Sequence, residues 1–197
     1  MFRLLAIALL ATAAECYKLP ASSMGRRSAI ATGAATTCAI FLNPAASEAS
    51  VQACAKGANN CYSASSSGKN QMPIWSFPAG AEKDSALKVL AEVVSAYPQE
   101  GQNDADKGGW KLVDGDLASG NAKLEFRSGL GNFAKFFNGG KPFVDDLEFS
   151  LADGGVAVFS SSRVGDSDFG VNMKRLNWIS AKLRAQGWNA PDVKPLQ

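Results

Sequence analysis

The chain has 197 residues, of which 46% are apolar and 19% are charged; its formal net charge is +2, and it contains no histidine. This composition is typical of a globular protein and excludes a disordered or collagen-like chain. The small net charge gives no indication of nucleic-acid binding. Because histidine is missing, Ser-His-Asp and Cys-His catalysis are excluded, as are zinc and haem sites with histidine ligands.

Residues 1–49 have the features of a targeting leader. Arg3 precedes an apolar run as long as a secretory signal core and too short for a membrane span. Arg26 and Arg27 precede a weakly apolar run, as in a Tat export signal. A signal peptide, a basic serine-rich stretch and a twin-arginine signal, in this order, resemble the three-part leader of a thylakoid-lumen protein in an alga with a secondary plastid. We therefore expect the plastid thylakoid lumen; the alternative is secretion, or a membrane anchor formed by residues 28–42.

Residues 50–197 are expected to be the mature protein, folded as one domain without a transmembrane segment. The leader carries four basic and two acidic side chains, which accounts for the whole net charge of +2. The expected mature part is therefore close to neutral. No internal repeat is visible in it.

The two cysteines of this part, Cys54 and Cys61, flank a short segment that contains the turn-forming residues Gly57, Asn59 and Asn60. In an oxidising compartment such a pair forms a disulfide, and we predict one here. The alternative is a pair of free buried thiols. A metal site is not expected, because the mature part offers no further cysteine and no histidine.

The first regular element is predicted as a helix over residues 83–96, where Leu87, Leu90 and Val94 recur at helical spacing. Before it, residues 73–78 read as an extended apolar strap between two prolines. From residue 110 onward apolar residues recur at every second position, which is typical of half-buried strands. Strands are predicted over residues 110–113, 123–127, 146–151 and 156–163, and a final helix over residues 171–186.

Turn signals connect these elements. Asp114-Gly115 predicts a turn after the first strand, and Asp153-Gly154-Gly155 predicts a hairpin between the last two strands. The order of elements favours an α+β fold: a four-stranded antiparallel sheet with an N-terminal and a C-terminal helix packed on one face. A glycine-bounded segment between the second and third strands is expected to form a short amphipathic helix and a partner contact, through Phe133, Phe136 and Phe137.

Charged and polar side chains are concentrated between the third strand and the final helix. Strand alternation places Asp146 and Glu148 on one face of the sheet and Asp145 on the other. The hairpin brings Arg163 back toward these carboxylates, and Asp168 lies where it can cap the final helix. The candidate cluster comprises Asp145, Asp146, Glu148, Arg163, Asp168, Asn172, Lys174 and Arg175. It either binds a polar ligand or a divalent cation, or serves only to hold the corner together through ion pairs and a helix cap.

Residues 143–149 and 158–175 carry the sequence features of the DUF1499 family, as does the Cys54-x6-Cys61 opening. The resemblance covers residues 54–187 and implies a single domain of a type found in bacteria, cyanobacteria and plastids, with unknown function. The chain departs from the family pattern at Ala55, where proline is usual. It also has a longer connection between the second and third predicted strands.

Two functions follow from these observations. The first is a non-catalytic lumenal protein that associates with a thylakoid membrane complex, either a photosystem or its antenna. The alternative is a small lumenal enzyme or polar-ligand-binding module that uses the corner formed by Asp145, Asp146, Arg163 and Asp168. No cofactor, catalytic residue or metal site is predicted, and no nucleic-acid partner.

Overall fold

A computed structural model of the protein describes residues 50–129 and 138–196. Within these residues, six strands and two α-helices follow one another, with two single-turn 3-10 helices between them. The elements are β1 (Cys61–Ser63), η1 (Gly68–Asn70), β2 (Trp75–Ser76), α1 (Lys83–Ser95), β3 (Trp110–Asp116), η2 (Leu117–Ser119), β4 (Asn121–Arg127), β5 (Val144–Ala152), β6 (Gly155–Ser162) and α3 (Val171–Arg184).

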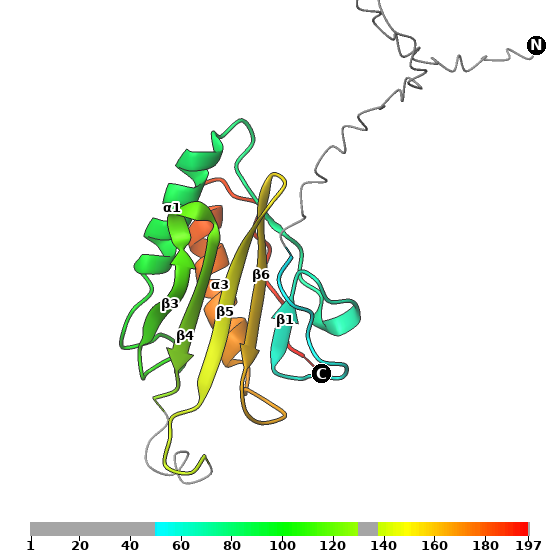
Figure 1. Ribbon diagram of the computed structural model, residues 1–197, viewed down its shortest axis with the longest axis vertical. Coiled ribbons are helices and arrows are strands. Elements are labelled where there is room, and N and C mark those ends of the chain that lie inside the picture. The colour runs from blue at the N-terminus through cyan, green and yellow to red at the C-terminus, as the bar shows by residue number, and fades with distance from the viewer. Residues whose placement is uncertain (1–49, 130–137, 197) are drawn as a thin grey trace, which may run out of the picture. The chain divides into compact units, whose positions relative to one another are not determined.

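The strands form one antiparallel sheet with the order β1-β6-β5-β4-β3 (Figure 1). β2 pairs with the start of β6, where Trp75 lies opposite Val156, and β1 pairs with its end, where Tyr62 lies opposite Ser160. The predicted α+β class and antiparallel pairing are thus correct, but the sheet has six strands rather than four. The added strands, β1 and β2, are three and two residues long, too short to show a periodic pattern in the sequence.

Both helices cover the same face of the sheet, and the main core lies between these two layers (Figure 1). The predicted apolar stripes do face this core: Leu87, Leu90 and Val94 in α1 are buried there. In α3 the corresponding stripe is Leu176, Ile179 and Leu183. Alternate residues of the strands complete the core, namely Ala122, Leu124, Phe126, Leu147, Phe149, Val156 and Val158.

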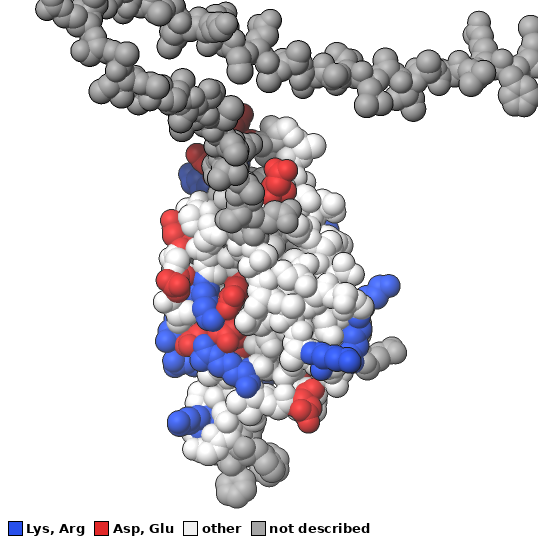
Figure 2. All heavy atoms as spheres, turned by 45° about the vertical axis from the view of Figure 1, so that its right-hand side comes forward, with Lys and Arg blue, Asp and Glu red and all other residues white. Residues whose placement is uncertain are grey.

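The opposite face of the sheet is covered only in part by the segment that precedes β1. Val51 and Cys61 form a second, smaller core there with Ala157 and Phe159 of β6. Over β3, β4 and β5 the same face carries charged side chains, and Figure 2 shows positive and negative groups intermixed in one patch. The two faces of the sheet therefore differ in chemistry.

The turn predicted at Asp114-Gly115 is wrong. β3 continues through both residues, with a register irregularity between Leu112 and Asp114, and the chain reverses instead at η2. Gly115 has a φ of 74°, and a Cβ atom there would lie 2.2 Å from the carbonyl oxygen of Asn121. Glycine is thus needed here because β3 and β4 approach closely at the register irregularity, and not because the chain turns.

The final helix ends at Arg184, two residues before its predicted end, and a glycine follows shortly after, as predicted. Gly187 has a φ of 85°, and the next amide, that of Trp188, donates to the carbonyl of Leu183. Such a left-handed glycine is a frequent helix stop. The chain then runs back over the core and buries Trp188, Ala190 and Val193. Among the described residues, no helix is both long enough and apolar enough to cross a membrane.

Candidate functional site

The most strongly buried charge in the described part of the chain is the guanidinium group of Arg175 on α3, whose side chain is 0% exposed. Two of its nitrogens donate to Asp106, at 2.9 and 2.5 Å, and one of these also donates to Asp145 at 2.6 Å. Its third nitrogen donates to Asn172 at 2.6 Å and to the hydroxyl of Ser160 at 3.2 Å. These five bonds match the five N–H donors of a guanidinium group. All donors of Arg175 are therefore used within these five residues, which we call the Arg175 cluster.

Aromatic rings enclose this cluster. The guanidinium carbon of Arg175 lies 4.3 Å from the ring centroid of Phe126, a cation–π contact. The ring of Tyr97 packs edge-on against those of Phe126 and Trp178, and its hydroxyl donates to Asp106 at 2.7 Å. Burial and the neighbouring charge of Asp106 raise the pKa of Tyr97 well above its usual value, so the hydroxyl remains a donor.

The charge state of the cluster is fixed by its own ion pairs. Burial alone lowers the pKa of Arg175, but the charges of Asp106 and Asp145 outweigh it, and the pKa is raised. Arg175 therefore remains a cation inside the core. A buried cation with two carboxylate partners and no exposed surface holds the elements around it together, and it has no donor left for a ligand.

A tightly folded loop between α1 and β3 brings Asp106 into the core. Gln102 and Ala105 exchange two backbone hydrogen bonds, and Asn103, Asp104 and Asp106 all have positive φ angles, of 46°, 63° and 56°. Asparagine and aspartate tolerate this left-handed conformation better than other non-glycine residues. The sequence pattern predicted only a polar loop here, so the part played by Asp106 in the cluster was missed.

The start of α3 is held by Asp168 and Asn172. One carboxylate oxygen of Asp168 accepts from the amide of Gly170 at 3.0 Å, and the other accepts from the amide of Asn172 at 2.8 Å. The side-chain amide of Asn172 donates to the same carboxylate and to the backbone oxygen of Asn60. Asp168 thus caps α3 as expected, by accepting from a first-turn amide, although the N-cap residue itself is Gly170.

A second group of charges lies on the opposite, open face of the sheet. Arg163 donates two hydrogen bonds to Asp146, at 2.9 and 2.7 Å, and one to Glu125 at 2.6 Å. Lys123 pairs with Glu148 at 2.7 Å, and Lys111 pairs with Glu125 at 3.0 Å. This outer charge ladder contains as many positive as negative side chains and is therefore neutral.

The pKa shifts follow this pairing. Hydrogen bonds from Lys111 and Arg163 lower the pKa of Glu125, and the bond to Glu148 raises the pKa of Lys123. Each group is thus held in its charged form. Arg163 is 41% exposed, so its ion pairs are screened by water and each contributes about 0–1 kcal/mol.

The predicted polar cluster is in fact two clusters on opposite faces of the sheet. Asp145, Asn172 and Arg175 lie on the inner face, whereas Asp146, Glu148 and Arg163 lie on the outer face, as strand alternation requires. Arg163 bonds to Asp146, one of the carboxylates toward which the hairpin was expected to bring it, whereas Asp145 bonds to Arg175, so one corner does not unite Asp145 with Arg163. Lys174 contributes its backbone carbonyl, which accepts from Gln102. The inner residues missed from the sequence are Asp106, Tyr97 and Ser160, and the outer ones are Glu125, Lys111 and Lys123.

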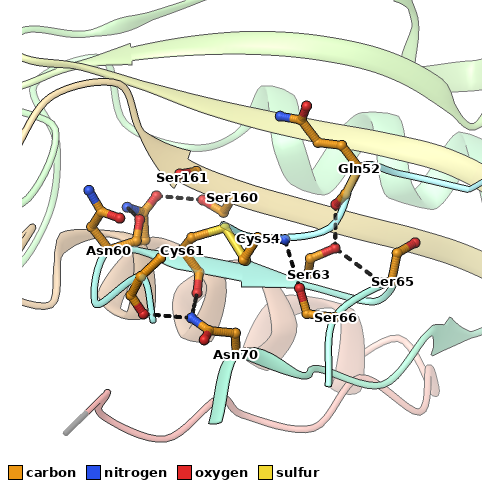
Figure 3. The surroundings of a disulfide bond; sticks show 12 residues. Gln52, Cys54, Asn60, Cys61, Ser63, Ser65, Ser66, Asn70, Ser160 and Ser161 are labelled. Atoms are coloured by element: carbon orange, nitrogen blue, oxygen red, sulfur yellow. Dashed lines mark hydrogen bonds between the residues drawn. A yellow bond between two sulfur atoms is a disulfide. The ribbon is translucent and has the colours of Figure 1, made fainter. Parts of the chain in front are cut away.

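The predicted disulfide between Cys54 and Cys61 is confirmed, with the two Cα atoms 5.8 Å apart (Figure 3). The segments around it are tied by further bonds: the amide of Cys54 donates to Ser66, and the side chain of Asn70 donates to the carbonyl of Cys61. Ser63 donates to the backbone oxygen of Gln52. The disulfide thus holds the N-terminal segment against β1 and β6.

Two surface hollows lie away from the Arg175 cluster. One, of about 380 Å³, lies on the outer face beside Lys123 and Glu148 and reaches the N-terminal segment at Ser50. The other, of about 570 Å³, lies between η1 and the C-terminal tail, next to Tyr62. Neither is lined by a residue of the cluster. Within the described ranges, His, Cys, Asp and Glu side chains nowhere gather in threes or more in a way that could hold a metal ion.

Some expectations fall outside the described residues. These are the targeting leader, residues 1–49, and the three phenylalanines expected to contact a partner, Phe133, Phe136 and Phe137. They stay predictions.

In a comparison with known protein families, residues 50–183 match the model of the family DUF1499, described as "Protein of unknown function". Comparisons with curated proteins and with solved structures find no match. The matched region spans the disulfide, the whole sheet and nearly all of the final helix. It therefore contains both the Arg175 cluster and the outer charge ladder. The chain belongs to the DUF1499 family.

Proposed function

We propose that the protein is a non-catalytic protein of the thylakoid lumen that associates with a photosynthetic membrane complex, either a photosystem or its antenna. The observation that carries the non-catalytic part is that every donor of the buried Arg175 is used inside its own cluster. The buried polar residues of this cluster bond to one another across α3, β5, β6 and the loop that carries Asp106. They hold the fold together, which favours a role performed by the protein's surface.

Two observations support the compartment. The leader combines a signal peptide with a twin-arginine signal, the order expected of a protein that crosses several plastid membranes. The domain also closes a disulfide between Cys54 and Cys61, and disulfides persist in oxidising compartments rather than in a reducing cytosol. A lumenal location brings the domain next to the photosynthetic complexes.

The alternative, a module that binds a polar ligand at the predicted corner, has less support. Its residues are divided between the two faces of the sheet, and Arg175 has no donor free for a ligand. Arg163, on the open face, already bonds to Asp146 and Glu125.

Native gel electrophoresis of mildly solubilised photosynthetic membranes tests the proposal. We expect the protein to migrate with a chlorophyll-containing complex and to begin near Ser50 on N-terminal sequencing. A control variant with both Arg26 and Arg27 replaced by Lys keeps the domain intact and is expected to retain its leader and to lose the association, because Tat-type export depends on the arginine pair. A wild-type protein that migrates only as a free monomer, or that begins near Met1, contradicts the proposal.

A further inference from the structure

The loop between β6 and α3 presents a single aromatic ring to solvent. Phe169 is 85% exposed, more than any other large apolar side chain in the described part of the chain. Val164, on the same loop, is 45% exposed. An exposed phenylalanine gains nothing from the hydrophobic effect in the isolated domain, so core packing does not account for its presence.

The backbone of Phe169 is also unfavourable for this residue type. Its φ angle is +53°, in the left-handed region where bulky side chains are rare and where glycine or asparagine meets less resistance. The residue is thus unfavourable on two counts, exposure and conformation. Unfavourable backbone conformations of this kind are found preferentially at functional sites.

The loop is held in place before any partner arrives. Ser167 accepts a hydrogen bond from the amide of Phe169, and Asp168 accepts from the amide of Gly170. On the other side, the side chain of Asn60 donates to the carbonyl of Gly165 at 2.6 Å. A ring presented on a fixed loop loses little conformational freedom on binding, which favours a role as a binding anchor.

We propose that Phe169 is the anchor through which this protein contacts its partner: the ring enters an apolar pocket, rimmed by basic residues, on a protein of the membrane complex. The proposal rests on the proposed function. Aromatic residues are over-represented among the side chains that dominate interface energies. The basic rim is inferred from the loop's own charge: the carboxylate of Asp168 is taken up by the start of α3 and Arg163 by its ion pairs, which leaves the exposed Asp166 to set the sign of the loop's surface.

Two other occupants fit less well. An anionic lipid surface attracts basic segments, whereas the exposed carboxylate of this loop, Asp166, would be repelled by it. A second copy of the chain, docked through the same loop about a twofold axis, would bring like charges together. A protein pocket with basic residues at its rim is complementary in both shape and charge.

The variant Phe169→Gly separates binding from folding. Glycine removes the ring and relieves the left-handed conformation, so the melting temperature is expected to be no lower than that of the wild type. The fraction of protein that migrates with the membrane complex on a native gel is expected to fall at least tenfold. Ile74→Ser, which removes another exposed apolar side chain, 42% exposed, on a different part of the surface, is expected to leave that fraction unchanged.

The outcomes distinguish this inference from the function on which it rests. If the wild type and Phe169→Gly both migrate with the complex, the function stands and the anchor is wrong. If the wild type migrates alone, the proposed function is wrong and the anchor, which rests on it, is wrong as well. If the wild type migrates with the complex, a photo-crosslinking phenylalanine analogue placed at position 169 in the intact organelle gives a second test of the anchor. A crosslink to an apolar pocket flanked by Lys or Arg on one identified protein supports it. Crosslinks to lipid, to a second copy, or to nothing overturn it.

Discussion

Replacing Arg175 by methionine is expected to destabilise the domain strongly. Methionine retains much of the apolar volume but removes all five hydrogen bonds and leaves Asp106 and Asp145 without their cation. Their side chains are only 1% and 10% exposed, so water cannot replace the lost partner. Breaking a buried ion pair in this way costs about 3–5 kcal/mol. For a domain of this size, that corresponds to a fall in melting temperature of roughly 6–20 °C.

The matched control is Arg163→Met, the same substitution on the opposite face of the same sheet. Arg163 also has two carboxylate partners, but it is 41% exposed, so the loss of both ion pairs is expected to cost about 0–2 kcal/mol in total. Urea unfolding of the oxidised wild type and both variants, followed by far-UV circular dichroism, gives the two free-energy differences. Equal costs for the two variants, or a cost below about 1 kcal/mol for Arg175→Met, would refute the reasoning.

Two further predictions concern the loop that carries Asp106 and the stability of the domain at alkaline pH. Gly101→Ala is expected to lower the free energy of unfolding by roughly 1–3 kcal/mol more than Gly80→Ala. Both glycines have φ near 75°, but of the two only Gly101 would bring an added Cβ against a neighbour, the carbonyl oxygen of Ala105 at 2.0 Å. Equal unfolding midpoints of the two variants in urea would argue against the expected difference. Burial and the charge of Asp168 raise the pKa of Tyr62 to about 12. The unfolded chain therefore releases this proton first, and stability is lost as the pH rises from about 10 toward 12. In Tyr62→Phe the free energy of unfolding is expected to fall less steeply between about pH 10 and 12 than in the wild type. The same fall with pH in both proteins would count against this prediction.

The regular elements could be predicted from the sequence because their side-chain periods are visible in it. The apolar stripe of Leu176, Ile179 and Leu183 marked α3, and the alternation along β5 placed Asp145 and Asp146 on opposite faces correctly. These predictions depend only on local geometry, which a helix or a long strand repeats several times.

The rest of the site depends on contacts between distant residues. Asp106 meets Arg175 across 69 positions of sequence, from an irregular loop that no period marks. Arg163 was expected to pair with one of the neighbouring carboxylates, and it does pair with Asp146, but the sequence did not show that Asp145, on the other face of the sheet, would pair with Arg175 instead. The positive φ of Phe169 likewise has no signal in composition or spacing.

The central claim is that the buried polar cluster builds the fold while the surface performs the function. The most direct test is to express Arg175→Lys in the native organelle and measure both the amount of folded protein and the fraction of it that migrates with the membrane complex. Lysine keeps the charge but cannot supply five donors in the planar arrangement of a guanidinium group. We predict less folded protein, with an unchanged fraction of it in the complex. Wild-type amounts of folded protein that no longer associate would contradict the claim.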